Sequence, residues 1–229
     1  FNLNDKCIKC GGISVQNSGK TEIENVQFVN THTNPALSIM QRSNLTCELI
    51  VSDCIFDSFS GRKCFDIQSR TTTLVFQNNI MKNIVLDSSS NSCLGYINAK
   101  INVLDLVNVT FIDNKLNSNN VFGLLFTGVS TLSFMKCKFI NNEAQEKPSL
   151  NGETAQFNSM NIEFIDCSFK HNKAFRNGGA VSIETQKSIE FKGCLFDHNV
   201  ASSRGKGGAI FINRHSPLNN EIAQIAIEE

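Results

Sequence analysis

A nine-residue frame recurs along the chain, and it constrains the fold more than any other feature of the sequence. The clearest copies span residues 134–142, 164–172 and 191–199, with a cysteine at the fourth place, a phenylalanine at the sixth and an asparagine at the ninth. Looser copies span residues 106–114, 75–83, 51–59 and 23–31. A period of roughly 20 to 50 residues is typical of solenoids and other stacked architectures, in which each repeat is one structural unit.

The sixth place of the frame serves as an anchor, and successive anchors are 24 to 31 residues apart. The anchors are Phe28, Phe56, Ile80, Phe111, Phe139, Phe169 and Phe196. A second block, as in Gly178-Gly179-Ala180-Val181, begins 18 residues before its anchor in several copies, whereas the connection from an anchor to the next block varies in length. Insertions confined to one corner are typical of a fixed cross-section that carries loops on one face.

Within a repeat, apolar and polar residues alternate with the period of a strand. In the last clear copy Ile189 and Phe191 alternate in this way, and the parity slips by one residue at Lys192-Gly193 before Cys194. Such a slip fits a corner between two strands that share one inner face. The sequence therefore predicts an all-β fold, namely a right-handed, single-stranded parallel β-helix of about seven to eight turns with three short strands per turn.

We expect residues 1–229 to form one β-helix segment of a longer protein. The repeats are weak over residues 1–105 and clear over residues 106–213, and residues 219–229 have the pattern of a further turn that is beginning. No apolar stretch approaches the roughly 20 residues that span a bilayer, so no transmembrane segment is expected in this stretch.

Stacking the copies brings like side chains into ladders along the helix axis. The expected ladders are Phe139, Phe169 and Phe196; Asn142, Asn172 and Asn199; and Cys137, Cys167 and Cys194. Phenylalanine fills the interior, while asparagine tolerates left-handed backbone at a corner and its amide can donate to the next turn. The Gly-Gly pair is expected to form a turn in which a Cβ would clash.

The chain contains nine cysteines. Cysteines of the ladder lie close enough for a disulfide, yet cysteine is also a good small apolar filler, and we favour buried free thiols there. Cys7 and Cys10 form a lone Cys-x-x-Cys motif with no second pair, which argues against zinc and favours a disulfide near the amino end.

Composition disfavours several functions. The chain has 21 Lys+Arg and 21 Asp+Glu and thus a net charge of zero, which argues against a nucleic-acid partner. With 18 Phe, one Tyr and no Trp, it has a single ring with the polar edge that glycan-binding platforms usually use, which argues against a glycan-binding module. No phosphate-binding loop or calcium loop occurs, and we expect neither a cofactor nor a metal ion.

Two N-glycosylation sequons begin at Asn44 and Asn108. Chance alone gives roughly four sequons in a chain this rich in Asn, Ser and Thr, so the motif by itself is no evidence of secretion. Asn44 lies in a longer connection and Asn108 at a corner, where a glycan could be attached.

The motif Phe-x-x-Asn occurs at 111–114, 139–142, 169–172 and 196–199, and it is interleaved with Gly-Gly-Ala-Val at 178–181 and Gly-Gly-Ala-Ile at 207–210. This pattern resembles the repeats of chlamydial polymorphic membrane proteins, and similar repeats occur in large protist surface proteins. The resemblance covers residues 106–213 well. It implies a surface-exposed, adhesin-like, right-handed β-helix of the pectin-lyase-like kind. Such short motifs specify an architecture better than an activity.

The function expected from this pattern is that of a noncatalytic structural or adhesin-like rod, located outside the cell or on its surface. The variable loops would recognise other copies of the chain, other surface or matrix proteins, or glycans, and they span residues 115–120, 142–150, 174–177 and 200–206. Unpaired strands at the ends of a β-helix would also allow filaments.

The alternative function is a polysaccharide lyase or hydrolase that uses a groove on the same fold. Such enzymes need clustered carboxylates, often with calcium, Arg or a second acid. Asp53 and Asp166 share a corner position with Lys136, so carboxylates do not accumulate there. His171 and His198 are expected to form an exposed, solvated pair. We therefore assign no catalytic residue.

Overall fold

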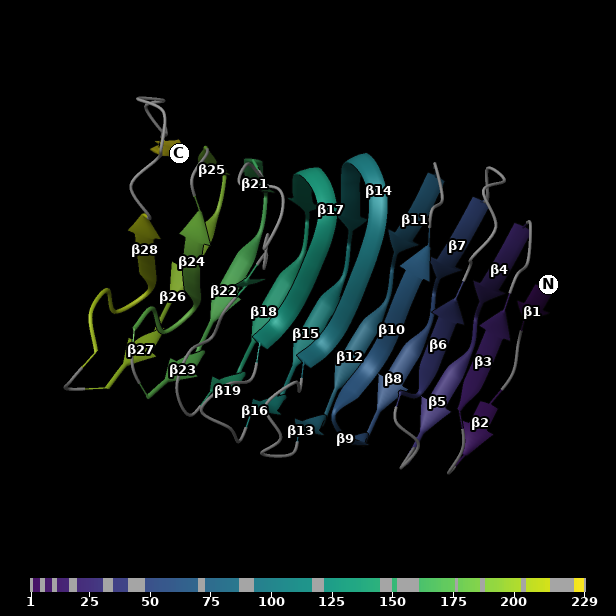
Figure 1. The fold of residues 1–229 in the computed structure, drawn as a ribbon. Coiled ribbons are helices and arrows are strands. Elements are labelled where there is room, and N and C mark those ends of the chain that lie inside the picture. The colour runs from purple at the N-terminus through teal and green to yellow at the C-terminus, as the bar shows by residue number, and fades with distance from the viewer. Residues whose placement is uncertain are drawn as a thin grey trace.

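The computed structural model shows parallel strands stacked as a β-solenoid, with the two termini at opposite ends of the stack (Figure 1). The structure describes residues 2–4, 7–9, 12–16, 20–30, 35–40, 48–69, 73–86, 93–116, 122–144, 150–151, 161–175, 177–185, 188–202, 205–214 and 225–228. These residues include no helix, and so none long and apolar enough to cross a membrane. The expected all-β parallel architecture is confirmed.

The largest sheet has 13 strands. Its main path runs through β1 (Asn2–Asn4), β4 (Lys20–Glu24), β7 (Glu48–Ser52), β11 (Thr73–Gln77), β14 (Cys93–Val107), β17 (Phe122–Met135), β21 (Asn161–Ile165), β25 (Ile189–Lys192) and β29 (Ile225–Glu228). Beside this path lie β3 (Ile13–Gln16), β6 (Leu37–Met40), β10 (Lys63–Ser69) and β20 (Leu150–Asn151). The long, curved strands β14 and β17 belong to both parts of the sheet (Figure 1).

The second sheet carries the phenylalanine anchors. Its eight strands are β2 (Cys7–Lys9), β5 (Gln27–Val29), β8 (Ile55–Asp57), β12 (Ile80–Lys82), β15 (Thr110–Ile112), β18 (Lys138–Ile140), β22 (Ser168–Lys170) and β26 (Leu195–Asp197). In this sheet Met81 pairs with both Phe56 and Phe111. The expected anchor Ile80 is therefore wrong by one residue, because Met81 is the fully buried member of that turn.

A third sheet was not expected. The third strand predicted for each turn was the one that follows the Gly-Gly block, as at Val181 and Ile183, whereas each strand of this sheet has only two residues and shows no alternation. Its six strands are β9 (Ser60–Gly61), β13 (Val85–Leu86), β16 (Lys115–Leu116), β19 (Glu143–Ala144), β23 (Lys173–Ala174) and β27 (Val200–Ala201). Between β9 and β27 the chain passes five times through all three sheets. A further pair, β24 (Val181–Thr185) and β28 (Ile210–Arg214), follows the two Gly-Gly blocks.

The corners on either side of the second sheet each place one residue in left-handed backbone, with φ between 48° and 58°, in all seven turns from β5 to β26, where the structure describes them. The corner before this sheet uses Asn25, Asp53, Asn78, Asn108, Lys136, Asp166 and Gly193. The corner after it uses Asn30, Ser58, Asn83, Asp113, Asn141, His171 and His198. Asn and Asp predominate because their short polar side chains tolerate this conformation. The slip expected at Lys192-Gly193 is thus a corner, with φ of 58° at Gly193.

The interior of the solenoid is apolar. Its largest fully buried side chains are mostly phenylalanines, among them Phe28, Phe56, Phe111, Phe134, Phe164, Phe169 and Phe191. Neighbouring turns pair in register, so each ring lies over its equivalent in the next turn, as for Phe164 on Phe191 with centroids 4.8 Å apart. Burial of such rings contributes roughly 2 to 3 kcal/mol each and is the main stabilising contribution to the stack.

Candidate functional site

Phe139, Phe169 and Phe196 form one continuous stack on β18, β22 and β26. Ring centroids are 4.8 Å apart between Phe139 and Phe169 and 4.7 Å apart between Phe169 and Phe196, with interplanar angles of 4° and 1°. Phe111 continues the stack at 4.9 Å from Phe139. These rings face the interior, so their role is packing rather than recognition.

The cysteine ladder lies at the corner that precedes the second sheet. Cys137 and Cys167 are buried, Cys194 is half-buried, and all three are free thiols. Each sulfur lies 3.2 Å from a carbonyl oxygen one turn earlier, on Leu106, Phe134 and Phe164 respectively. The neighbouring thiol Cys137, together with burial, raises the pKa of Cys167 to about 12, so this thiol stays protonated at neutral pH.

Two further members of this column are absent from the predicted ladder. Cys54 is a buried free thiol 3.4 Å from the carbonyl oxygen of Ile23, and burial raises its pKa to about 11. Asn79 follows in the next turn, fully buried, where its Oδ1 accepts from the backbone N–H of Cys54. The sequence frame at 51–59 already places Cys54 at the fourth position, with the other ladder cysteines. The frame at 75–83 begins one residue too early, as its anchor Ile80 shows, so its fourth position falls on Asn78 instead of Asn79.

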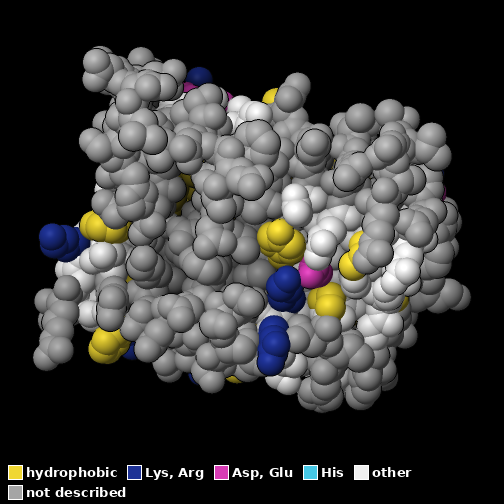
Figure 2. Space-filling model, viewed as in Figure 1, with side chains coloured by type: hydrophobic (Ala, Val, Ile, Leu, Met, Phe, Trp, Pro, Cys, Tyr) yellow, Lys and Arg dark blue, Asp and Glu magenta, His cyan; other side chains and the backbone are white. Residues whose placement is uncertain are grey.

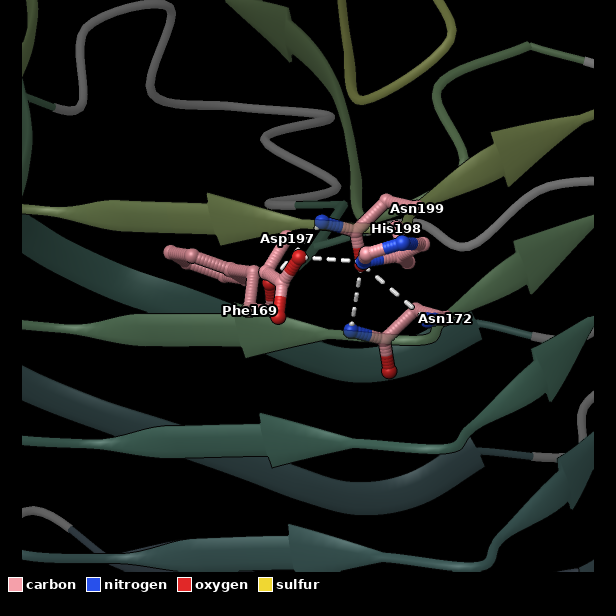
Figure 3. A network of polar contacts seen from close by, with 5 residues as sticks. All are labelled: Phe169, Asn172, Asp197, His198 and Asn199. Atoms are coloured by element: carbon pink, nitrogen blue, oxygen red, sulfur yellow. Dashed lines mark hydrogen bonds and ion pairs between the residues drawn. The ribbon is translucent and has the colours of Figure 1, made fainter.

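The asparagine ladder is present and extends to Asn114. Asn172 Nδ2 donates to Asn199 Oδ1 at 2.9 Å, and the backbone N–H of Asn172 donates to the same oxygen at 3.0 Å (Figure 3). Asn142 makes the same pair of contacts with Asn172 Oδ1, both at 3.0 Å. Asn114 Nδ2 reaches Asn142 Oδ1 at 2.9 Å. From Asn142 to Asn199, each ladder asparagine contacts the preceding turn through both ends of its side-chain amide. Its Oδ1 accepts from the asparagine of that turn, and its Nδ2 donates to the carbonyl oxygen of the phenylalanine of that turn.

The expected reason for these asparagines is wrong in one respect. Left-handed backbone occurs at Asn141, His171 and His198, each one residue before a ladder asparagine. The ladder residue itself turns its side chain inward, where it satisfies backbone groups at the corner. Asparagine is therefore selected there for its hydrogen bonds and not for its backbone conformation.

The two sequons fall in different parts of the chain. Asn44 lies outside the described residues. Asn108 is exposed at the corner before β15, with φ of 53°, and its Nδ2 donates to Asn78 Oδ1 at 3.0 Å. Glycosylation at Asn108 stays a prediction, and the amide nitrogen that would carry the glycan also bridges two turns.

The paired cysteines expected near the amino end cannot be placed, because the side chain of Cys7 and all of Cys10 lie outside the described residues. Asp53 and Asp166 occupy the expected common corner, and both have left-handed backbone there. Asp53 Oδ1 accepts from Asn78 Nδ2 at 3.1 Å. These aspartates thus have a structural reason to stand where they do.

The strands of the third sheet end where the variable connections begin. β16, β19, β23 and β27 stack in this order. The loops predicted at 115–120, 142–150, 174–177 and 200–206 are wrong in their first residues, because residues 115–116, 143–144, 174 and 200–201 belong to these strands. Of the remainder, residues 117–120 and 145–149 lie outside the described residues. The outward column of this sheet is Val85, Lys115, Glu143, Lys173 and Val200. Val200 and the neighbouring Phe175 are 53% and 59% exposed, so this corner presents apolar surface among charged side chains.

A further cluster contains His171 and His198, which were predicted to form a pair, and also Asp197, which was not predicted to lie beside them. The imidazole centroids of the two histidines are 5.2 Å apart, and His198 Nδ1 contacts Asp197 Oδ1. This hydrogen bond holds the pKa of Asp197 below its usual value, with the nearby His171 and Lys170 contributing. Both histidines are exposed, as expected.

No family model, curated protein or solved structure matches this chain. On the face shown in Figure 2, the described hydrophobic, basic and acidic side chains lie interspersed rather than in one large patch of a single kind. We take the loop-bearing edge of the third sheet as the candidate recognition site, because exposed Phe175 and Val200 lie there beside the charged pair Lys173 and Glu143. We call it the loop edge, defined by β16, β19, β23 and β27.

Proposed function

We propose that this chain is a noncatalytic, adhesin-like structural rod at the cell surface or outside the cell, and that its loop edge recognises a partner. The observation that carries this proposal is the stacking of β16, β19, β23 and β27, which aligns the starting points of four variable connections along one edge of a rigid scaffold. Binding residues are commonly placed on loops that a rigid scaffold positions.

We further propose that the rod is a right-handed helix of about seven to eight turns. Support for the number of turns comes from the second sheet, in which eight strands pair in parallel, one from each turn. Support for the hand is general, because crossover connections between parallel strands of one sheet are right-handed in nearly all proteins.

The partners that fit this edge are other copies of the chain, other surface or matrix proteins, or glycans. Phe175 and Val200 give it exposed apolar area, and the adjacent Lys173 and Glu143 form an ion pair at 3.8 Å. Protein interfaces commonly have an apolar centre with a polar rim. A net charge of zero favours neither a nucleic acid nor another polyanion.

A direct test is binding of the purified chain to arrays of matrix proteins and glycans, and to itself. Phe175→Ser should reduce binding at least about tenfold if the loop edge is the contact surface. Val103→Ser is the matched control, since Val103 is 54% exposed but lies on β14 in another sheet. Equal effects of the two variants, or no binding at all, would contradict the proposed recognition surface.

Electron microscopy of the same sample tests self-association, because unpaired end strands can add a further copy. The enzymatic alternative is tested by incubation with polysaccharides. New reducing ends or unsaturated products that disappear in an Asp166→Asn variant would replace the noncatalytic assignment with a lyase or hydrolase.

A further inference from the structure

Two adjacent turns bring three metal-ligating side chains together at the corner that follows the second sheet. Asp197 is the last residue of β26, His198 follows it, and His171 occupies the same corner one turn earlier. One ligand atom from each residue can be chosen so that all three lie within 4.8 Å of one another. Figure 3 shows Asp197 and His198 beside the Asn172–Asn199 step of the ladder.

The backbone under this cluster is held by hydrogen bonds between the turns. The N–H of His171 donates to the carbonyl oxygen of Asp197 at 2.9 Å. Asn172 and Asn199 follow the two histidines directly, and Asn172 Nδ2 donates to Asn199 Oδ1 at 2.9 Å. The two histidine positions are therefore fixed relative to each other, and only the exposed side chains need to rotate.

The other turns show what this corner ordinarily holds. One turn before His171, Asn141 Nδ2 donates to Asp113 Oδ1 at 2.6 Å, and two turns before Asn141, Asn83 Nδ2 donates to Asp57 Oδ1 at 2.9 Å. In those turns an amide and a carboxylate satisfy each other. At His171 and His198 two imidazoles instead stack with their centroids 5.2 Å apart, and a carboxylate lies beside one of them.

Two imidazoles and a carboxylate form the mixed nitrogen and oxygen donor set that zinc and its neighbours in the transition series prefer. Calcium and magnesium prefer oxygen ligands alone, so this set does not suit them. We propose that His171, Asp197 and His198 bind a divalent transition-metal ion of the zinc class, with at least one coordination position open to a further ligand.

Metal bonds of about 2.0 to 2.2 Å require the ligand atoms to approach one another more closely than 4.8 Å. Rotation of the side chains can provide this, because the side chains of His198 and Asp197 are 76% and 38% exposed. The present contact between His198 Nδ1 and Asp197 Oδ1 would give way to metal bonds if both of these atoms ligate the ion. This proposal does not depend on the adhesin-like function.

Lys170 is the group that opposes cation binding. It pairs in register with Asp197 on the neighbouring strand, and both side chains point outward because Phe169 and Phe196 point inward. A cation near the carboxylate weakens the attraction for a second cation. Lys170→Gln should therefore raise zinc affinity severalfold, a result that a merely structural role of the cluster does not produce.

The test is calorimetric titration of the reduced, full chain with zinc chloride, combined with optical spectra of the cobalt(II) form. We expect one saturable ion per chain, with affinity reduced at least about tenfold in His171→Gln and in His198→Gln. His32→Gln is the matched control and should leave the affinity unchanged. Circular dichroism checks that each variant keeps its strand content.

Three outcomes would overturn the proposal. They are the absence of saturable binding, binding that neither His171→Gln nor His198→Gln weakens, and a cobalt spectrum dominated by thiolate charge transfer that Cys194→Ser removes. The last outcome would assign the ion to the half-buried cysteine instead.

Discussion

At the scale of single residues, the ladder asparagines connect the turns in a way that apolar packing cannot. Asn172 is buried, with 4% exposure, and its amide takes part in four contacts, as acceptor from Asn142 and as donor to Asn199 and to the carbonyl oxygen of Phe139 at 2.8 Å. Three turns before Asn172 the same column holds Ile84, and one turn before that Phe59, both buried. An apolar side chain is therefore acceptable in this column only where the adjacent turns do not depend on its amide.

Replacing Asn172 tests this dependence. Asn172→Leu leaves the carbonyl oxygen of Phe139 and the N–H of Asn142 without their side-chain partners, so we expect a loss of about 2 to 4 kcal/mol in the free energy of unfolding. Ile84→Val in the same column removes only one methylene and should cost about 0.5 to 1.5 kcal/mol. Urea denaturation followed by circular dichroism measures both. A cost for Asn172→Leu no larger than that for Ile84→Val would contradict a hydrogen-bonding role for the ladder.

Asp57 makes stability depend on pH. Partial burial alone would raise its pKa, but hydrogen bonds from Asn83 and Ser58 and the Lys82 ammonium, whose Nζ lies 3.2 Å from Oδ2, hold the pKa below its usual value. A lowered native pKa stabilises the fold above the unfolded-state pKa of about 3.9, and this contribution is lost as the pH falls through the native value.

We therefore expect Asp57→Asn to lower the free energy of unfolding by about 0.5 to 1 kcal/mol at pH 7. The difference from the unmodified chain should shrink steadily as the pH falls below about 4. Urea titrations at a series of pH values measure this, with Asp105→Asn on the exposed side of β14 as the control. A difference that stays constant with pH would show that the carboxylate is not the cause.

At the scale of elements, the two Gly-Gly blocks show which glycines the turn requires. Gly178 has φ of 61°, and a Cβ there would lie 2.1 Å from the carbonyl oxygen of Val181. Gly207, its equivalent in the next turn, has φ of 64°, and a Cβ there would lie 1.9 Å from the carbonyl oxygen of Ile210. At Gly208 a Cβ would have no atom within 4 Å. The first glycine of the pair is thus needed by backbone geometry, whereas the second is needed only where another turn covers it.

This difference gives a matched pair of variants. Gly178→Ala combines left-handed backbone with a clash against main chain, and it should cost at least about 2 kcal/mol. Gly208→Ala should change the free energy of unfolding by less than about 1 kcal/mol, because it meets neither obstacle. Thermal and urea unfolding of the two proteins measure the difference. Similar costs for both would mean that the blocks are not turns of the kind described.

Only some of the elements could be predicted from the sequence. Alternation and the anchor spacing predicted the stacked parallel strands and the first corner, because a period of two and a parity slip are local signals. The third sheet escaped prediction, since strands of two residues are too short to show alternation. Asp197 was not predicted as a neighbour of the two histidines, because the aligned frames place it opposite Lys170, and only the direction of its side chain brings it to His198.

At the scale of the whole molecule, stability depends on keeping every turn in register with the next. Each turn contacts mainly its two neighbours, so an error in one turn disturbs the ladders on both sides. In β21 the inward residues are Ile162 and Phe164, paired with Ile189 and Phe191 of the next turn. The connections after the third sheet, by contrast, differ in length from turn to turn.

Two insertions distinguish these regions. One alanine inserted after Glu163 reverses the inward parity within β21, so either Ile162 or Phe164 must leave the core, and the loss should be at least about 2 to 3 kcal/mol. Gly-Ser-Gly-Ser inserted after Lys147, between β19 and β20, only lengthens a connection, and loop-closure entropy limits its cost to about 1 kcal/mol. Urea denaturation of both variants measures the contrast. If the longer insertion proved as costly as the single alanine, the variable corner would be part of the packed cross-section, and the recognition surface proposed for it would have to be sought elsewhere.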